Sequence, residues 1–247
     1  MILNLMAMGG RIATFYPTPS QEARADQALV SRTVLFANVN QNNTDYDGLR
    51  QVVEAEAPHV VVLAEADSNW ITGIKLAEAD FPYRHLEPRN DLFGMAIYAD
   101  QPFKAQTHYV GALQLPLVYA EFEHYVLLAV HPIPPLNSKF ALDNQLYMQT
   151  LVALTAQSQK PVLITGDFNA SLWSHALQPL AGNNIKSLSP SGWGYTWPTK
   201  FWPLATQIDH AFIKNIPKGK TRILGDIGSD HYPILTHIEL SGRSVDK

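Results

Sequence analysis

The feature that most constrains the fold is a run of five apolar residues, 60–64, that ends directly at the acid Glu65. Neighbouring side chains of a β-strand point to opposite faces, so a strand that is apolar at every position must be covered on both faces. Two further apolar runs, residues 125–130 and 161–165, lead to His131 and to Gly166-Asp167. The sequence therefore predicts central, doubly covered strands that end in polar side chains.

The remaining pattern mixes strands with helices. A helix is expected after the polar turn at residues 40–45 and is stopped by Pro58, and a second is expected over residues 139–157. Leu142 and Leu146 are among the apolar positions expected on that second helix. Further strands are expected at residues 33–39, 94–98, 117–122, 208–213 and 234–240. Several connections between consecutive expected strands are too short to contain a crossover helix. We therefore predict two mixed β-sheets packed face to face with helices outside.

Composition narrows the class of protein. The chain has 247 residues, of which 46% are hydrophobic and 16% charged, as in a globular protein. Its formal net charge of -4 gives no global positive field to recruit nucleic acid, although a local basic groove or bound metal ions can supply that attraction. The absence of cysteine excludes disulfides, thiolate metal sites and cysteine nucleophiles.

We divide the chain into an N-terminal lead-in, residues 1–32, and one catalytic domain, residues 33–247. Residues 1–8 are apolar but far shorter than the roughly 20 residues that a membrane helix needs. The lead-in fits either an ordinary surface arm or the end of a membrane anchor, and the second reading would give membrane association through the N-terminus. The sequence does not determine the cellular compartment. It is compatible with a membrane-associated or exported bacterial domain.

The polar residues at the strand ends predict a metal site. Neighbouring strand ends meet at one edge of a sheet, so the carboxylates there lie near one another and repel. A hard cation removes that cost, and carboxylate and amide oxygens are the ligands that Mg²⁺, Mn²⁺ or Ca²⁺ prefer. We therefore predict Mg²⁺ (or Mn²⁺) as cofactor, acting as a Lewis acid on a phosphoryl group. The strand-end residues are Asn38, Glu65, His131, Asp167, Asp209, Asp230 and His231.

Two short motifs carry the chemistry. In Gly166-Asp167-Phe168-Asn169, Asp167 suits a role in orienting or deprotonating a water, and Asn169 suits donation to a phosphoryl oxygen. The same letters are also typical of an ordinary turn. In Asp230-His231, the histidine can move a proton near neutral pH if a carboxylate fixes its tautomer, and Asp209 is the candidate. A turn with a surface histidine also fits that motif, and His131 alone also fits a structural role.

In this order and spacing, these residues resemble the endonuclease/exonuclease/phosphatase superfamily over about residues 33–240. The superfamily includes deoxyribonuclease I, apurinic endonucleases, inositol polyphosphate 5-phosphatases and neutral sphingomyelinases. The resemblance implies a four-layered α/β sandwich, in agreement with the two covered sheets. It also implies a catalytic set and a metal set. The catalytic set is His131, Asp167, Asn169, Asp209 and His231, and the metal set is Asn38, Glu65 and Asp230.

The closer likeness is to bacterial members in which this domain follows N-terminal membrane helices. Residues 38–43, 131–135, 196–198 and 207–210, together with Trp70, carry that likeness. There are departures from the family pattern, since Ala64 stands where many members have Gln. The acid that partners the first histidine in the deoxyribonuclease branch has only Asp91 as a match. Weaker substrate contacts are expected at Asn40, Asp91, Trp193, Trp197 and Lys200.

The expected activity is metal-dependent hydrolysis of a phosphodiester by in-line attack of a water activated by Asp167 and His231. We favour an endonuclease or exonuclease, acting as a monomer on nucleic acid. The alternative is a phosphatase or phospholipase acting on a lipid or inositol phosphate headgroup. The aromatic loop at residues 191–206 leaves both open, because its rings suit stacking on bases, insertion among lipids or simple packing. A non-enzymatic binding domain is disfavoured, since buried carboxylates without a metal only destabilise a protein.

Overall fold

The computed structural model describes residues 29–189 and 194–241, and these form two six-stranded sheets packed face to face. The first sheet has the spatial order β11 (Lys218–Ile223), β12 (Ile234–Ser241), β1 (Leu29–Asn38), β2 (Val60–Ala64), β4 (Met95–Ala99) and β3 (Tyr83–Glu87). The second has the order β5 (Lys104–Val110), β6 (Leu115–Glu121), β7 (Val126–Val130), β8 (Val162–Asp167), β10 (Asp209–Lys214) and β9 (Lys186–Ser187).

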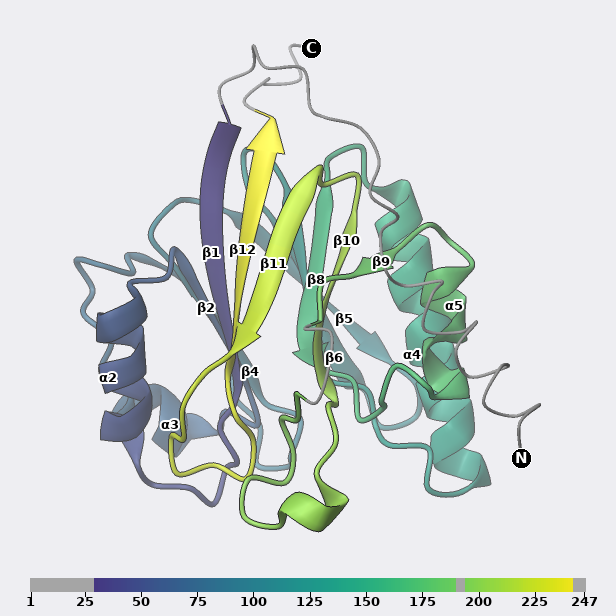
Figure 1. The fold of residues 1–247 in the computed structure, drawn as a ribbon, viewed down its shortest axis with the longest axis horizontal. Helices are drawn as coiled ribbons and strands as arrows, with labels where there is room; N and C mark the ends of the chain where they lie inside the picture. The colour runs from purple at the N-terminus through teal and green to yellow at the C-terminus, as the bar shows by residue number, and fades with distance from the viewer. Residues whose placement is uncertain (1–28, 190–193, 242–247) are drawn as a thin grey trace.

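Helices cover the outer face of each sheet, which gives four layers (Figure 1). α2 (Tyr46–Glu56) and α3 (Ser68–Gly73) lie on the first sheet, and α4 (Ser138–Gln157) and α5 (Gln178–Ala181) lie on the second. Two 3₁₀ turns, η1 (His175–Leu177) and η2 (Trp202–Leu204), lie in the loops. The predicted α/β sandwich of two mixed sheets is confirmed.

Three apolar clusters hold the layers together. The cluster between the sheets takes alternate residues of the central strands, such as Val34 and Phe36 from β1 and Leu127 and Ala129 from β7. The residues in between face outward and pack under the helices, as Leu35 does beneath α2. This two-sided burial is the reason that the central strands read as unbroken apolar runs.

Strand direction brings the polar residues to one edge. β1 and β2 are parallel, and so are β7 and β8, so each of these pairs ends together. β12 runs antiparallel to β1 and β10 runs antiparallel to β8, so the starts of these two strands lie at the same edge as the ends of their partners. The residues that end β1, β2, β7 and β8 therefore meet those that begin β10 and precede β12.

The long helix α4 confirms the expected helix at residues 139–157 but corrects two of the positions expected on its apolar face. Asn137 caps it by accepting a hydrogen bond from the backbone nitrogen of Phe140 at 3.0 Å. Tyr147 and Leu151 are buried, whereas Leu142 is 66% exposed and Leu146 is 44% exposed. The buried face also carries Asp143, Asn144 and Thr155, so apolar spacing alone did not identify it.

The N-terminal boundary also differs, because β1 begins at Leu29, inside the expected lead-in. Residues 1–28, on which the anchor hypothesis rests, lie outside the described residues. Within the described ranges, no helix has the length and apolar character needed to cross a membrane.

Gly166 provides a test of how closely β7 and β8 are packed at the site edge. A Cβ atom at this position would lie 1.9 Å from the carbonyl oxygen of Val130 on the neighbouring strand. We expect Gly166→Ala to lower the free energy of unfolding by about 3 kcal/mol or more, because the backbone must move to relieve the clash. Urea denaturation measures the change.

The matched control is Gly225→Ala, since a Cβ added at Gly225 meets nothing within 4 Å. We expect this variant to unfold within about 0.5 kcal/mol of the unmodified protein. Equal stability of the Gly166→Ala and Gly225→Ala variants would contradict the packing described for this edge.

Candidate active site

Asn38 joins the two sheets at the site edge. Its Nδ2 donates to Glu65 Oε1 at 2.9 Å and to Asp167 Oδ2 at 3.1 Å, so one amide links β1 and β2 to β8. Its Oδ1 accepts from the backbone nitrogen of Asn40 at 3.1 Å. Asn38 thus presents its amide nitrogen to the carboxylates, and its expected role as a metal ligand through Oδ1 stays a prediction.

Asp209 and His231 form a buried pair, as the sequence analysis expected. The register of β10 against β8 places Asp209 directly beside Asp167. His231 Nδ1 lies 2.9 Å from Asp209 Oδ2, which fixes the ring so that Nε2 faces Asp167 Oδ2 at 3.8 Å. Burial opposes the charged imidazole, but Asp209, with smaller contributions from Asp167 and Asp230, outweighs it and raises the pKa of His231. His231 is therefore protonated near neutral pH.

The loops beside this pair are tied to it by hydroxyl groups. Thr196 Oγ1 accepts from the backbone nitrogen of Asp209 at 3.2 Å. Ser229 Oγ donates to the carbonyl oxygen of Asn38 at 2.8 Å and accepts from the nitrogen of His231 at 3.1 Å. The aromatic loop and the β11–β12 loop are therefore fixed directly to the edge that carries Asp209 and His231.

Asp167 and Asn169 occupy one tight turn after β8. Asp167 Oδ1 accepts from the backbone nitrogen of Asn169 at 2.8 Å, and Asn169 Nδ2 donates to the carbonyl oxygen of Pro132 at 3.0 Å. One hydrogen of that amide remains for a ligand. Burial and the neighbouring charge of Asp209 raise the pKa of Asp167. A buried carboxylate of this kind is a suitable proton acceptor near neutral pH.

Three residues of the site leave their strands in a left-handed backbone conformation. Asn40 has a φ of 53°, Glu65 a φ of 58° and Asn169 a φ of 50°. Asparagine adopts this conformation readily, but glutamate does so at a cost that the surrounding structure must offset. The sharp exit of Glu65 from β2 turns its side chain toward Asn38 and the edge of the sheet.

His210 is a residue whose place at the site the sequence analysis missed. It is fully buried, its Nε2 donates to the carbonyl oxygen of Ala170 at 2.9 Å, and its Nδ1 lies 2.8 Å from Ser189 Oγ. Burial lowers the pKa of His210 to about 4, so the ring is neutral. It anchors the turn that carries Asp167 and Asn169. Its position next to Asp209 in the sequence was the available signal.

His131 lies at the site without the acid partner that the resemblance suggested. Its Nε2 is 3.5 Å from Asp167 Oδ2, and its buried Nδ1 has no hydrogen-bond partner among the described residues. Burial outweighs the nearby charge of Glu65 and lowers the pKa of His131 to about 4. Asp91 instead binds Arg89 through both carboxylate oxygens, at 2.8 and 2.6 Å. The structure therefore corrects the match of Asp91 to a partner of His131.

Asp230 holds a tryptophan at the mouth of the site. Its Oδ1 accepts from Asn40 Nδ2 at 2.8 Å, and its Oδ2 accepts from Trp197 Nε1 at 3.0 Å. Metal binding by Asp230 stays a prediction, as do substrate contacts by Asn40 and Trp197. Lys200 is exposed in the following turn, and Trp193 lies outside the described residues.

Part of this group lines a cavity of about 620 Å³, within the usual range for small-molecule sites. Glu65, Asp167, Asp230 and His231 form its polar part. Ligand atoms of Asp167, Asp209 and His231 lie within 4.8 Å of one another. Burial also raises the pKa of Glu65, and Asp209 Oδ1 is buried without a partner among the described groups. A cluster of carboxylates with spare oxygens fits a hard divalent cation.

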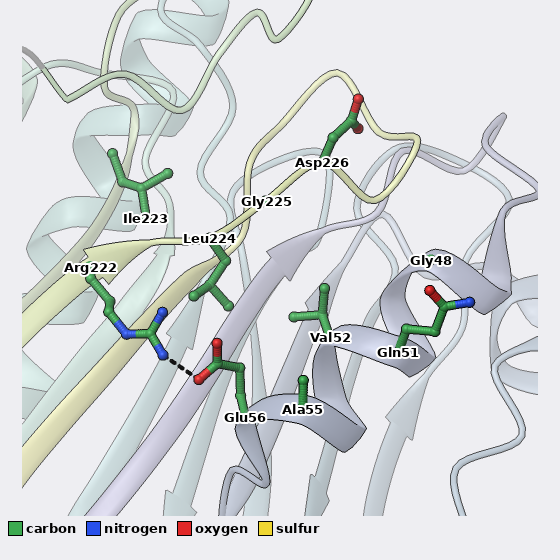
Figure 2. A pocket seen from close by; sticks show the side chains of 10 residues that line it. All are labelled: Gly48, Gln51, Val52, Ala55, Glu56, Arg222, Ile223, Leu224, Gly225 and Asp226. Atoms are coloured by element: carbon green, nitrogen blue, oxygen red, sulfur yellow. Dashed lines mark hydrogen bonds and ion pairs between the residues drawn. The ribbon is translucent and has the colours of Figure 1, made fainter.

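A separate hollow lies between α2 and the end of β11 (Figure 2). Arg222 reaches across it to form an ion pair with Glu56. Val52, Ala55 and Leu224 supply apolar surface around that pair. None of the strand-end residues lines this hollow, so it does not belong to the candidate active site.

Comparison with solved structures supports the fold. Zebrafish (D. rerio) TDP2 complexed with single strand DNA product is 15% identical, with a TM-score of 0.69, and the match covers 84% of this chain and 98% of that one. The endonuclease/exonuclease/phosphatase from Beutenbergia cavernae is 17% identical, with a TM-score of 0.68, and the match covers 87% of this chain and 73% of that one. The endonuclease/exonuclease/phosphatase from Bacteroides vulgatus is 14% identical, with a TM-score of 0.67, and coverage of 86% and 100%.

No curated protein matches the chain by sequence. At these identities the structural likeness shows the shared fold alone. The sequence itself matches the Endonuclease/Exonuclease/phosphatase family over residues 34–231, a range that contains every predicted catalytic and metal residue. The chain belongs to the Endonuclease/Exonuclease/phosphatase family.

Proposed function

We propose that the protein is a divalent-metal-dependent phosphodiesterase. One observation carries the proposal. The Asp209–His231 pair faces Asp167, and Asn38 links Asp167 to Glu65. Of these residues, Glu65, Asp167 and His231 line the polar end of one cavity. A protonated imidazole beside carboxylates that can take a proton suits a reaction in which water attacks an anionic centre.

The metal is proposed at the carboxylates of this polar end. Glu65 is the main candidate ligand, because it lines the cavity and one of its oxygens is not committed to Asn38. Asp230 and the Asp167–Asp209 pair supply further oxygens nearby. A bound Mg²⁺ or Mn²⁺ would supply Lewis-acid polarisation of a phosphoryl oxygen and would offset the repulsion among these acids.

The chain's own residues supply proton transfer and charge stabilisation. Asp167 accepts a proton from the attacking water, whose oxygen forms a bond to phosphorus as the opposite ester bond breaks. The leaving oxygen takes a proton from solvent water, and the products are a phosphomonoester and an alcohol. The protonated His231 and the free amide hydrogen of Asn169 donate to phosphoryl oxygens as charge builds there. His131, being neutral, suits a hydrogen bond to the phosphate rather than donation of a proton.

The nuclease form that we favoured from the sequence remains a proposal within this activity. In this form Trp197 would be the ring on which a base stacks, since it is 36% exposed and lies 6.4 Å from the ring of His231. Nicking of supercoiled plasmid with Mg²⁺ or Mn²⁺ tests this form. Hydrolysis of bis(p-nitrophenyl) phosphate tests the phosphodiesterase activity independently of nucleic acid.

We expect His231→Ala to reduce kcat on bis(p-nitrophenyl) phosphate by about 100-fold or more, because it removes the cation beside the reacting phosphate. EDTA should abolish the activity of the unmodified enzyme, and added Mn²⁺ should restore it. A thermal melt checks that the variant is folded. Full activity in a folded His231→Ala variant would exclude the proposed mechanism.

Asp209→Asn keeps the size of the side chain but removes its charge from His231. We expect kcat to fall by about 100-fold with little change in KM, because an amide no longer stabilises the imidazolium. Steady-state kinetics measure the two constants separately. Asp100→Asn, an exposed change just after β4, is the control and should leave both constants unchanged.

Glu65→Gln tests the metal site by binding rather than by rate. We expect the affinity for Mn²⁺, measured by isothermal titration calorimetry, to fall at least tenfold, as about 1.4 kcal/mol of ligand binding is lost. Glu54→Gln, at an exposed position of α2, is the control and should bind Mn²⁺ as the unmodified protein does. Unchanged Mn²⁺ affinity in Glu65→Gln would place the metal away from Glu65.

A further inference from the structure

The mouth of the active-site cavity is apolar although its inner end is acidic. Leu92, Phe93, Leu136 and Trp197 line the mouth. Leu136 is 80% exposed and Leu92 is 46% exposed, so two large aliphatic side chains stand in water beside the reacting groups. Exposed apolar side chains grouped at a binding cavity mark a surface that an apolar ligand covers.

Histidine is the only basic residue type in the described lining of the cavity, which contains neither Lys nor Arg. Arg89, the basic residue close to Leu92 in the sequence, binds Asp91 through Nε and Nη2 and donates from Nη1 to the carbonyl oxygen of Gln114. A protein that grips a nucleic-acid strand neutralises several phosphates with Lys and Arg. This cavity therefore suits one phosphate, held at its polar end, more than a polyanion.

An adjoining hollow extends the apolar surface. It has a volume of about 760 Å³ and is lined in part by Pro135, Met148 and Trp173, and it shares Ser174 with the active-site cavity. Trp173 is 49% exposed there. The segment at residues 134–136 runs between the two spaces, with Leu136 lining one and Pro135 lining the other. A long substituent of a phosphate bound at the acidic end therefore has room to continue along this surface.

We propose that Leu92, Phe93, Leu136 and Trp197 form a subsite for an alkyl or acyl chain, so that the substrate is an amphiphilic phosphodiester. This inference rests on the proposed phosphodiesterase activity and names its substrate class. The reaction is unchanged: water adds to phosphorus, one P–O ester bond breaks, and the leaving oxygen takes a proton. The apolar substituent stays against the four side chains while the phosphate occupies the acidic end.

The first experiment compares diesters that differ only in their chains. Dihexanoylphosphatidylcholine below its micellar concentration is set against glycerophosphocholine, and ³¹P NMR follows loss of the diester. We expect kcat/KM to be at least tenfold higher for the acylated diester, since covering a leucine side chain is worth roughly a tenfold effect or more. Dioleoylphosphatidylcholine vesicles form a second arm, which shows whether the amphiphile is taken as a monomer or from a lipid surface.

Variants locate the effect in the structure. Leu136→Ser should remove most of the preference for the acylated diester over glycerophosphocholine, because it removes the most exposed apolar side chain of the mouth. Leu142→Ser is the matched control, because Leu142 is also strongly exposed but lines neither space, and it should behave as the unmodified protein. Both leucines lie largely in solvent, so neither change threatens folding.

The outcomes separate this inference from the proposed function. Equal turnover of the two diesters, or faster cleavage of a thymidine oligonucleotide than of either, would overturn the apolar subsite while leaving the phosphodiesterase intact. If no diester is cleaved, calorimetric binding of dihexanoylphosphatidylcholine in EDTA still decides the matter. Binding that Leu136→Ser weakens tenfold and Leu142→Ser does not would support the subsite, and no binding would reject it.

Discussion

The burial of Asp167 and Asp209 side by side is the constraint on which the site depends. Antiparallel pairing of β8 and β10 makes the two residues direct neighbours, and both are almost fully buried. Two carboxylates so placed repel, and each needs donors that water no longer supplies. Asn38 and the turn at Asn169 supply donors to Asp167, and His231 supplies one to Asp209. The loops that carry Asn169 and His231 therefore supply the hydrogen-bond donors that these two buried carboxylates need.

The central strands and the layered arrangement could be predicted, because a strand that is buried on both faces is apolar at nearly every position. β2 and β7 are apolar at every position, and the structure confirms them. β3, β5 and β11 were not predicted. Each has charged or polar residues at half or more of its positions, as in Lys218-Gly219-Lys220-Thr221-Arg222 of β11. Each also lies at the edge of its sheet, where one face is exposed to solvent. Such strands are specified by their neighbours rather than by their own residues.

The site was predictable in its members but not in its contacts. Residues at strand ends were expected to converge, and Asn38, Glu65, Asp167 and His231 do lie together. The sequence could not show that Asn38 would turn its amide nitrogen to the acids, or that Asp91 would bind Arg89. These choices depend on loop conformations that no local pattern encodes. The left-handed backbone at Glu65 is one such conformation.

The two ends of the cavity are built by different physical means. The reacting end is assembled from strand termini, where hydrogen bonds between sheets fix each polar group and the core beneath keeps it rigid. The mouth is assembled from loops, and two of its apolar side chains, Leu92 and Leu136, are largely exposed to solvent. On the proposed function, a change at Leu92 or Leu136 would alter the mouth and leave the hydrogen bonds of Asp167 and Asp209 in place. A fold built in this way keeps one reaction while its substrates differ, because chemistry and selectivity reside in separable parts of the chain.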